Sequence, residues 1–247
     1  MARALDVEDM EAVVSGRSIY NLKFADDIGL LTESLTDLQS LLDRVDAESN
    51  RFGLTISRAM TEVQCIPPEG QPLLTNIGGV TLKQTKDFVY LGGKISDTIG
   101  SGADVERRID LAMGVARSMA EIWKAKDTMT STKVRLYNTL ALSVLLYNAE
   151  TWTIKEELRR KLLVFEMTVL QRIAGVTRWG RCRNADIRVE LGIGRDVVNR
   201  VRSKRLSYFG HVVRMQPTRT YSMEEYTGDD RLADPRKGGW TTSEKTA

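Results

Sequence analysis

The apolar residues of this chain change their spacing near Ser101, and this change constrains the fold more than any other feature. Before Ser101 the apolar runs are short and are separated by glycine, proline and aspartate, as at 54–56, 62–66 and 88–91. Runs of this kind predict short strands joined by turns. After Ser101 the apolar residues recur every three or four positions, which predicts helices. The sequence therefore predicts an α+β fold, with a small antiparallel sheet and a helix in its first part and only helices in its second part.

A capping signal and a glycine pair place further elements. Ser34 or Thr36 caps a helix that carries several leucines on one face and ends near Gly53. The pair Gly78-Gly79 predicts a hairpin turn. The helical spacing of the second part predicts helices at 101–123, 131–147, 155–174, 186–191 and 196–213.

Positive charge is concentrated in one segment of the chain. The net charge is +3, but residues 158–219 hold fifteen basic and four acidic residues, a balance of +11 that leaves −8 for the rest. Arginine outnumbers lysine in this segment, and its guanidinium makes forked contacts to phosphate. The balance favours binding to a polyanion such as nucleic acid. The alternative is that these charges form the solvated faces of helices.

Several classes of protein are not indicated. No apolar stretch reaches the roughly 20 residues that a membrane-spanning helix needs, and the first residues lack the apolar core of a signal peptide. Cys65 and Cys182 are too few for a disulfide framework or a zinc cluster. We therefore predict no membrane partner and an intracellular location, in the nucleus or the cytoplasm.

Two adjacent aspartates, Asp26 and Asp27, lie between the apolar runs 18–22 and 28–31. This arrangement predicts a β-hairpin with two carboxylates at its tip. Like charges at this spacing repel each other unless a cation or a partner offsets the repulsion. The pair therefore indicates a metal-dependent site, and the alternative is an ordinary aspartate-rich turn.

Five sequence blocks occur in an order that resembles one protein family. The first block is Phe24-Ala25-Asp26-Asp27, and the others follow at 52–57, 88–93, 136–152 and 208–215. Together they resemble the reverse transcriptases of non-LTR retrotransposons, of the endonuclease-reverse transcriptase type, from about residue 1 to residue 215. A lone aspartate pair is a weak signal, but four further blocks in the right order make the resemblance specific.

The resemblance implies an RNA-directed DNA polymerase that transfers nucleotides with bound Mg²⁺ or Mn²⁺ ions. Asp26 would be the stronger metal ligand and Asp27 the weaker one. Tyr90, Leu91 and Gly92 would form the primer grip, which places the 3′ end of the primer, and the helices that follow would form the thumb. The implied partners are an RNA template, an RNA–DNA hybrid or DNA.

Departures from the family pattern lead us to expect no activity of this chain alone. The fingers and the earlier palm strand with the first catalytic aspartate have no counterpart, and Asp6 and Asp9 lie too close in sequence to Asp26 to replace it. Ser57 and Met60 stand where the family usually has Asn and a Lys that assists departure of pyrophosphate. We therefore expect weak or absent metal binding, and the missing reverse-transcriptase portion would have to act in trans.

The predicted nucleic-acid contacts form two groups in the basic segment. Trp179 is an aromatic residue among arginines, a pattern typical of stacking on bases. The second group follows on a helix whose residues Val197, Val201, Leu206 and Phe209 mark an apolar face, so an amphipathic helix with solvated charges is the alternative. The predicted contact residues are Arg178, Trp179, Arg181, Arg183, Arg200, Arg202, Lys204 and Arg205.

These patterns predict four segments. They are a partial palm at 1–97 with both hairpins, a helical thumb-like region at 98–154, a basic helical region at 155–215 and a disordered polar tail at 216–247. The leading prediction is a truncated reverse transcriptase that is inactive alone. A nucleic-acid-binding module built on the basic helices is the alternative, and a marginally folded relic with exposed sheet edges is a third hypothesis.

Overall fold

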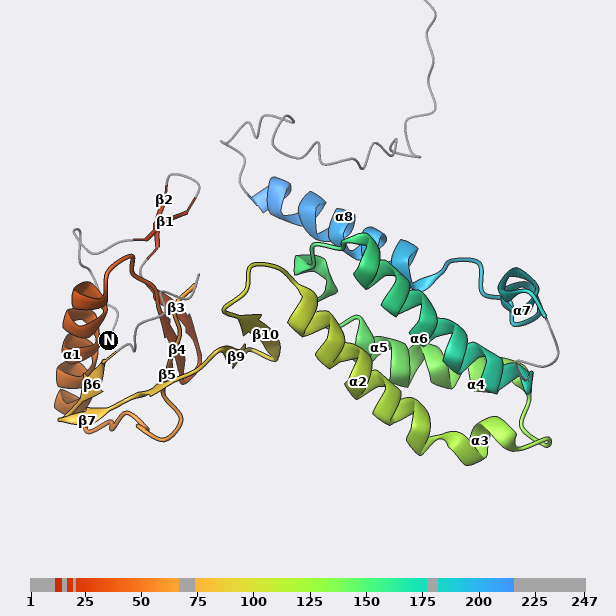
Figure 1. Cartoon of the computed structure of the whole chain (residues 1–247), viewed down its shortest axis with the longest axis horizontal. Coiled ribbons are helices and arrows are strands. Elements are labelled where there is room, and N and C mark those ends of the chain that lie inside the picture. The colour runs from red at the N-terminus through yellow and green to blue at the C-terminus, as the bar shows by residue number, and fades with distance from the viewer. Residues whose placement is uncertain (1–11, 15–16, 20, 67–73, 177–181, 216–247) are drawn as a thin grey trace, which may run out of the picture. The chain divides into compact units, whose positions relative to one another are not determined.

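The computed structural model describes residues 12–14, 17–19, 21–66, 74–176 and 182–215 (Figure 1). The chain divides into two compact units, Met1–Arg205 and Leu206–Ala247. The predicted tail at 216–247 lies outside the described residues, so its disorder stays a prediction. None of the described helices is long and apolar enough to cross a membrane.

The first part of the chain contains short strands and one helix, α1 (Leu35–Arg51), as the sequence predicts. Its strands are β1 (Ala12–Val14), β2 (Arg17–Ile19), β3 (Asn21–Phe24), β4 (Asp27–Leu30), β5 (Glu62–Val63), β6 (Asn76–Ile77), β7 (Val80–Thr81), β8 (Lys83–Gln84), β9 (Asp87–Tyr90) and β10 (Gly93–Ser96). Among the described residues they form two-stranded pairs, of which β5–β8 is parallel and the others are antiparallel. The expected small antiparallel sheet is thus replaced by separate pairs, because turns interrupt strands of only two to four residues.

Local signals in the first part are confirmed at two places. The side chain of Ser34 accepts a hydrogen bond from the backbone N–H of Thr36, at 3.2 Å, so Ser34 is the N-cap of α1. Gly78 and Gly79 turn the chain between β6 and β7, and both have positive φ angles, as a type I′ turn requires.

The predicted strand at 54–56 is wrong, because these residues have no regular structure and pair with none of the strands that the structure describes. Leu54 and Thr55 are exposed, and only Ile56 packs inward, against a small cluster of buried residues beneath α1. A strand with one inward residue and no partner gains too little burial to form. The buried members of the two clusters beneath α1 are Leu41, Leu42, Val45, Val63, Ile77 and Leu82.

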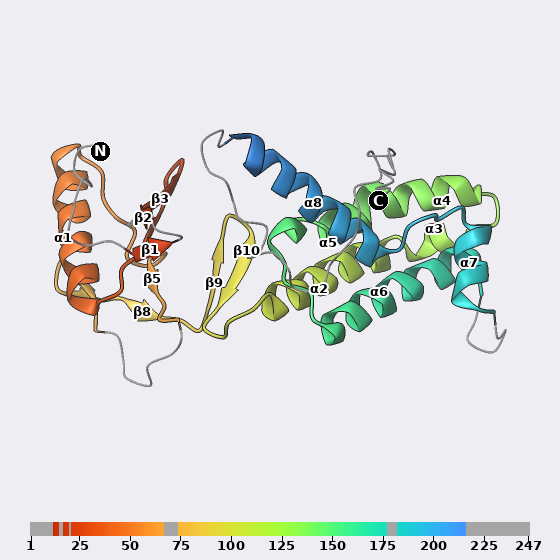
Figure 2. The same ribbon diagram turned by 90° about the horizontal axis from the view of Figure 1, so that it is seen from above.

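The second part is helical, as predicted, and holds the main core. Its helices are α2 (Gly102–Ser118), α3 (Ala120–Lys124), α4 (Thr130–Leu136), a π-helical segment (Tyr137–Ala141), α5 (Leu142–Leu145), a 3₁₀ turn (Ala149–Thr151), α6 (Glu156–Ala174), α7 (Asn184–Glu190) and α8 (Val197–Met215). The predicted helix at 101–123 is broken at Met119, and the predicted helix at 131–147 contains the π-helical segment. Helices α2, α5 and α6 lie close together (Figure 2). They enclose an apolar core in which Trp152, Tyr137 and Phe165 are fully buried.

An ion pair between Glu166 and Arg188 lies inside the helical part. Glu166 of α6 is 1% exposed, and its carboxylate accepts hydrogen bonds from Nη2 and Nε of Arg188 in α7, at 2.5 and 3.2 Å. The backbone N–H of Val197, at the start of α8, also bonds to this carboxylate. Burial raises the pKa of Glu166, and Arg188 opposes that shift. Glu166 therefore links three helices through one buried charge.

The substitution Arg188→Leu should lower the free energy of unfolding by about 3 kcal/mol near pH 8, because it leaves the Glu166 carboxylate buried without its cation. A raised pKa in the folded state means that protonation of Glu166 favours the folded chain, so the loss should shrink as the pH falls towards about 5. Urea denaturation followed by circular dichroism at both pH values measures the effect. The double variant Arg188→Leu, Glu166→Leu is the control and should recover most of the loss. A loss that does not change with pH would contradict this account.

Candidate functional site

The predicted aspartate hairpin is present. Strands β3 and β4 pair antiparallel with Phe24 opposite Asp27, and Ala25 and Asp26 form the turn between them. Both aspartates are exposed. Ala25 has a φ of 52°, in the left-handed region, which costs a residue with a side chain about 1 kcal/mol. The chain thus holds a strained turn where it presents its two adjacent carboxylates.

The two faces of this hairpin have different surroundings. Leu30 packs on the clusters beneath α1. Leu22 and Phe24 lie on the opposite face, together with Asp27, because residues alternate along a strand. The side chain of Phe24 is 63% exposed, although it is large and apolar. The face that carries Asp27 is therefore open.

Tyr90 of β9 meets this open face. Its hydroxyl donates a hydrogen bond to the backbone carbonyl of Leu22, at 3.4 Å. A Cβ atom on Gly29 would lie 3.9 Å from the Tyr90 ring, so the ring sits over this glycine. The structure thus brings together two hairpins that are about sixty residues apart in sequence, one with the aspartate pair and one with the predicted primer grip.

The tip of the second hairpin is clamped by helical residues. Leu91 and Gly92 form its turn, with φ angles of 47° and 79°. The hydroxyl of Tyr147 donates to the carbonyl of Leu91 at 2.8 Å. Arg107 Nη1 donates to the carbonyl of Gly92 at 2.9 Å, and Arg108 Nη2 donates to the same oxygen. Two guanidinium groups therefore fix one carbonyl of the predicted primer grip.

The side chains of Arg108 and Tyr147 also contact each other. The Arg108 guanidinium lies 4.2 Å from the centre of the Tyr147 ring, a cation–π distance. Burial lowers the pKa of Arg108, and the negative charge of Asp104 opposes this shift. The cation therefore sits between a carboxylate and an aromatic face.

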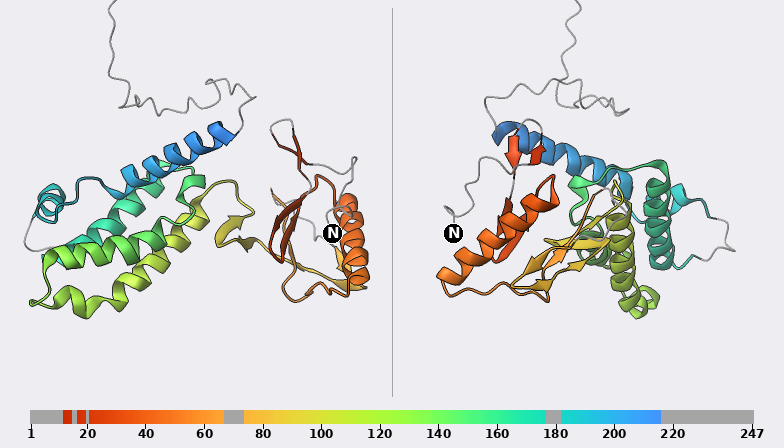
Figure 3. Two further views of the ribbon diagram at one scale, coloured as in Figure 1. Left: turned by 180° about the vertical axis from the view of Figure 1, so that it is seen from behind. Right: turned by 60° about the vertical axis from the view of Figure 1, so that its left-hand side comes forward.

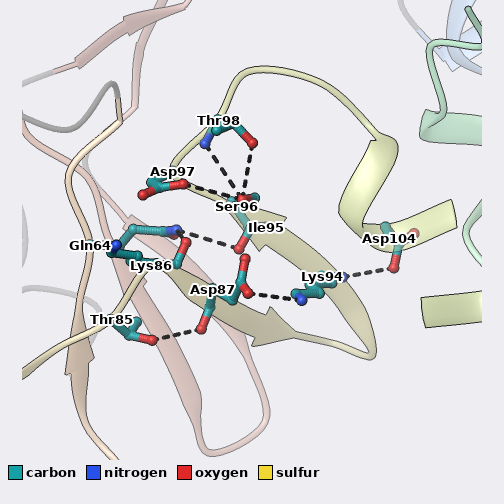
Figure 4. A network of polar contacts seen from close by, with 10 residues as sticks. All are labelled: Gln64, Thr85, Lys86, Asp87, Lys94, Ile95, Ser96, Asp97, Thr98 and Asp104. Atoms are coloured by element: carbon teal, nitrogen blue, oxygen red, sulfur yellow. Dashed lines mark hydrogen bonds and ion pairs between the residues drawn. The ribbon is translucent and has the colours of Figure 1, made fainter. Parts of the chain in front are cut away.

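The stem of this hairpin is fixed by Asp104 of α2 (Figure 4). The buried carboxylate of Asp104 accepts the backbone N–H of Lys94 at 2.8 Å and the indole N–H of Trp152 at 2.7 Å. Lys94 Nζ forms an ion pair with Asp87 across the hairpin, at 2.9 Å, and this hydrogen bond lowers the pKa of Asp87. Strand β10 lies beside the first turns of α2 (Figure 3).

The metal-ligand set of the candidate site is small. Within the described parts of the chain, no group of three or more His, Cys, Asp or Glu side chains could hold a metal ion. Asp26 and Asp27 are hard oxygen ligands of the kind that Mg²⁺ prefers, but they supply only two of its ligands. They fit the ion by chemistry and leave most of its coordination to water or to other donors.

The predicted nucleic-acid residues fall into different environments. Arg178, Trp179 and Arg181 lie outside the described residues. The side chain of Arg183 is 87% exposed and lies 3.4 Å from Asp186. Arg200, Arg202 and Arg205 are half-buried on α8.

Lys204, the remaining member of this set, is used inside the helical part. Its Nζ donates to the carbonyl of Leu146 at 3.0 Å and lies 3.6 Å from a carboxylate oxygen of Glu150. The apolar face expected on this helix is confirmed at Val197 and Val201, which are fully buried. The expectation is wrong at Leu206 and Phe209, which are exposed.

Asp104 and Arg108, which hold the second hairpin, are not among the site residues that the sequence predicts. Asp104 and Arg108 are spaced i, i+4 and follow the apolar face of α2, where Val105 and Ala112 are buried. Two opposite charges on an otherwise apolar helix face are the one signal that could have revealed them.

Comparison with known proteins gives one informative similarity. No family model matches the chain, and no solved structure matches it. An uncharacterized transposon-derived protein of Caenorhabditis elegans is 27% identical over 219 residues, which cover 83% of this chain and 76% of that protein. The chain is thus similar to a protein of transposon origin over most of its length.

The clamp at the hairpin tip predicts a specific cost for Gly92→Ala. A Cβ at Gly92 would lie 3.2 Å from the Tyr147 ring and 3.4 Å from Arg108 Nη2, in addition to its positive φ. We expect a loss of about 2 kcal/mol in the free energy of unfolding. Gly79→Ala is the matched control: it has a φ of 77° and no neighbouring atom within 4 Å, so we expect about 1 kcal/mol. Equal losses in urea denaturation would show that the clamp is not formed.

Proposed function

We propose that this chain is part of a reverse transcriptase of a non-LTR retrotransposon, and that it holds an RNA–DNA hybrid beside the aspartate hairpin. The similarity to a transposon-derived protein supports the general origin. The order of the five sequence blocks supports the specific assignment. Both of these observations come from sequence, and the contacts between the two hairpins are independent of them.

The contact between Tyr90 and the aspartate hairpin carries the proposal. Nucleotidyl transfer requires the 3′ oxygen of a primer close to the carboxylates that bind the metal ions. A segment that holds the primer must therefore lie beside those carboxylates. The hairpin with Tyr90, Leu91 and Gly92 meets this requirement, because the Tyr90 side chain contacts the face on which Asp27 lies.

Asp26 and Asp27 would hold Mg²⁺ or Mn²⁺ in this function. When bound, the ions would offset the negative charge that builds up on the transferred phosphate. The exposure of both aspartates leaves room for further ligands. We propose that a third carboxylate comes from a reverse-transcriptase portion outside these 247 residues, and that these residues alone do not polymerise.

The basic helical segment would bind the backbone of the duplex. Arg183 presents its guanidinium almost fully to solvent, as a phosphate contact requires. Lys204 is committed to Leu146 and Glu150, so we assign it a structural role and keep Arg200, Arg202 and Arg205 as the contacts on α8. A nucleic-acid-binding module without polymerase ancestry is the second candidate, and the same exposed arginine favours it.

Binding of a labelled RNA–DNA hybrid should be saturable and should weaken as salt rises. Because phosphate contacts release counterions, the slope of log K against log salt should fall in magnitude by about 0.9 for each contact removed. We expect this change, measured by fluorescence anisotropy, for Arg200→Gln and for Arg205→Gln. Arg51→Gln, the same change at an exposed arginine of α1 outside the basic segment, is the control and should leave the slope unchanged. Binding that is absent or insensitive to salt in a folded sample would remove both candidate functions.

The position of the primer end separates the two candidates. A chelated iron tethered to Asp27→Cys, in a chain with Cys65→Ser and Cys182→Ser, produces radicals that cut the nearest nucleotides. If the chain is a reverse-transcriptase part, the cuts should cluster at the primer 3′ end, and a tether at Ala47→Cys on α1 should give no such cluster. Cuts spread along the duplex from both tethers would leave only the binding module.

Primer extension tests the expected lack of activity in the same samples. With Mg²⁺ and nucleotides, the chain alone should add no nucleotide to the primer. Extension that disappears in Asp26→Ala would show that the chain is catalytically complete, and it would overturn this part of the proposal.

A further inference from the structure

The hairpin formed by β9 and β10 makes two unequal sets of contacts. On one side it meets the helices, and on the other side it meets the aspartate hairpin and Gln64 of the first part. An isolated two-stranded hairpin is marginally stable in water, so its position is set by whichever neighbour holds it more firmly.

Most contacts to the helices are partly buried and involve charged side chains. Asp104 and Arg108 are 3% and 7% exposed. Their bonds to the N–H of Lys94 and the carbonyl of Gly92 fix both the stem and the tip of the hairpin. Hydrogen bonds with a charged partner contribute more than neutral ones, and breaking them would leave each of these two buried charged groups without one of its hydrogen bonds. The hairpin therefore separates from the helices only at a high cost.

The contacts to the first part are exposed and neutral. Tyr90 donates one long hydrogen bond to Leu22. The amide of Gln64 donates to the carbonyls of Lys86 at 2.6 Å and of Ile95 at 3.4 Å, at the base of the hairpin (Figure 4). Bonds of this type exchange with water at little cost. The backbone remains tied to the first part up to Thr85, whose N–H bonds to the carbonyl of Val63.

We propose that Asp104 and Arg108 are positioning residues that make the β9–β10 hairpin move with the helices, about a hinge at Thr85–Asp87. That the hairpin moves with the helices follows from these contacts alone. Its functional meaning rests on the proposed function: the hairpin that holds the primer end would approach or leave the aspartates as the helices swing. The expected domain boundary at residue 97 then moves to the hinge, because the hairpin belongs with the helical part.

Spin-label distance measurements on the full chain test this inference. In the background without cysteines, one label pair joins Val89 to Leu111 of α2, and a second pair joins Val89 to Ala47 of α1; all three positions are exposed. We expect one narrow distance for the first pair and a broad distribution for the second. A broad distance distribution for the first pair, together with a narrow one for the second pair, would show that the hairpin belongs to the first part. That result would overturn the inference.

Variants then assign the effect to the positioning residues. Arg108→Met should broaden the distance distribution of the first pair and leave the helical circular dichroism unchanged. Arg117→Met, at an exposed arginine of the same helix, should change neither measurement. Arg108→Lys keeps the charge and should restore part of the narrow distribution. If Arg108→Met does not fold, Asp104→Asn replaces it as the milder change. A first pair that stays narrow in a folded variant of either residue would refute the assigned role of that residue.

Addition of an RNA–DNA hybrid separates the two proposals. If the proposed function is right, the bound duplex should narrow the distance distribution of the second pair, because the duplex bridges the helices and the aspartate hairpin. If the first pair behaves as expected and the hybrid changes nothing, the hinge stands and the proposed function fails.

Discussion

The carboxylate of Asp104 is the constraint on which the candidate site depends. It is buried, accepts the N–H groups of Lys94 and Trp152, and lies 3.9 Å from Nε of Arg108. A buried carboxylate is tolerated only where such partners are all present, because any missing one leaves charge uncompensated. One side chain thereby fixes a hairpin, a helix and the segment before α6 in a single arrangement.

The helices could be predicted from sequence because their hydrogen bonds and their apolar faces both repeat locally. The end of α6 shows this: apolar periodicity stops at Ala174, and Gly175 follows with a φ of 67°. The strands were harder, because pairing joins distant segments. The parallel pair β5–β8 links Glu62–Val63 with Lys83–Gln84, and no local signal selects that partner. The strand expected at 54–56 failed for the same reason, since none of the described strands pairs with it.

The same difference between local patterns and distant contacts decides which residues of the candidate site could be predicted. Asp26 and Asp27 could be predicted because a two-residue turn between apolar runs is a local pattern, and the structure has that hairpin. Arg108 could not be predicted, because its role comes from a carbonyl in another element, that of Gly92. Lys204 shows the opposite case: its charge was assigned to nucleic acid, but tertiary contacts with Leu146 and Glu150 use it. Charge in a sequence shows that a partner is needed, and only the fold shows which one.

The two sides of the candidate site differ in stability, and this difference follows from burial. The helices share a continuous core around Trp152 and Phe165. The aspartate hairpin packs one face on a small cluster through Leu30, and it leaves Phe24 in solvent. Elements with few buried apolar contacts open at lower free energy than elements in a large core. The predicted primer grip is therefore attached to the helices with the large core, and the carboxylates lie on the hairpin that opens at lower free energy. Under the proposed function this asymmetry would be useful, because one side would give way to a long duplex while the other kept its shape.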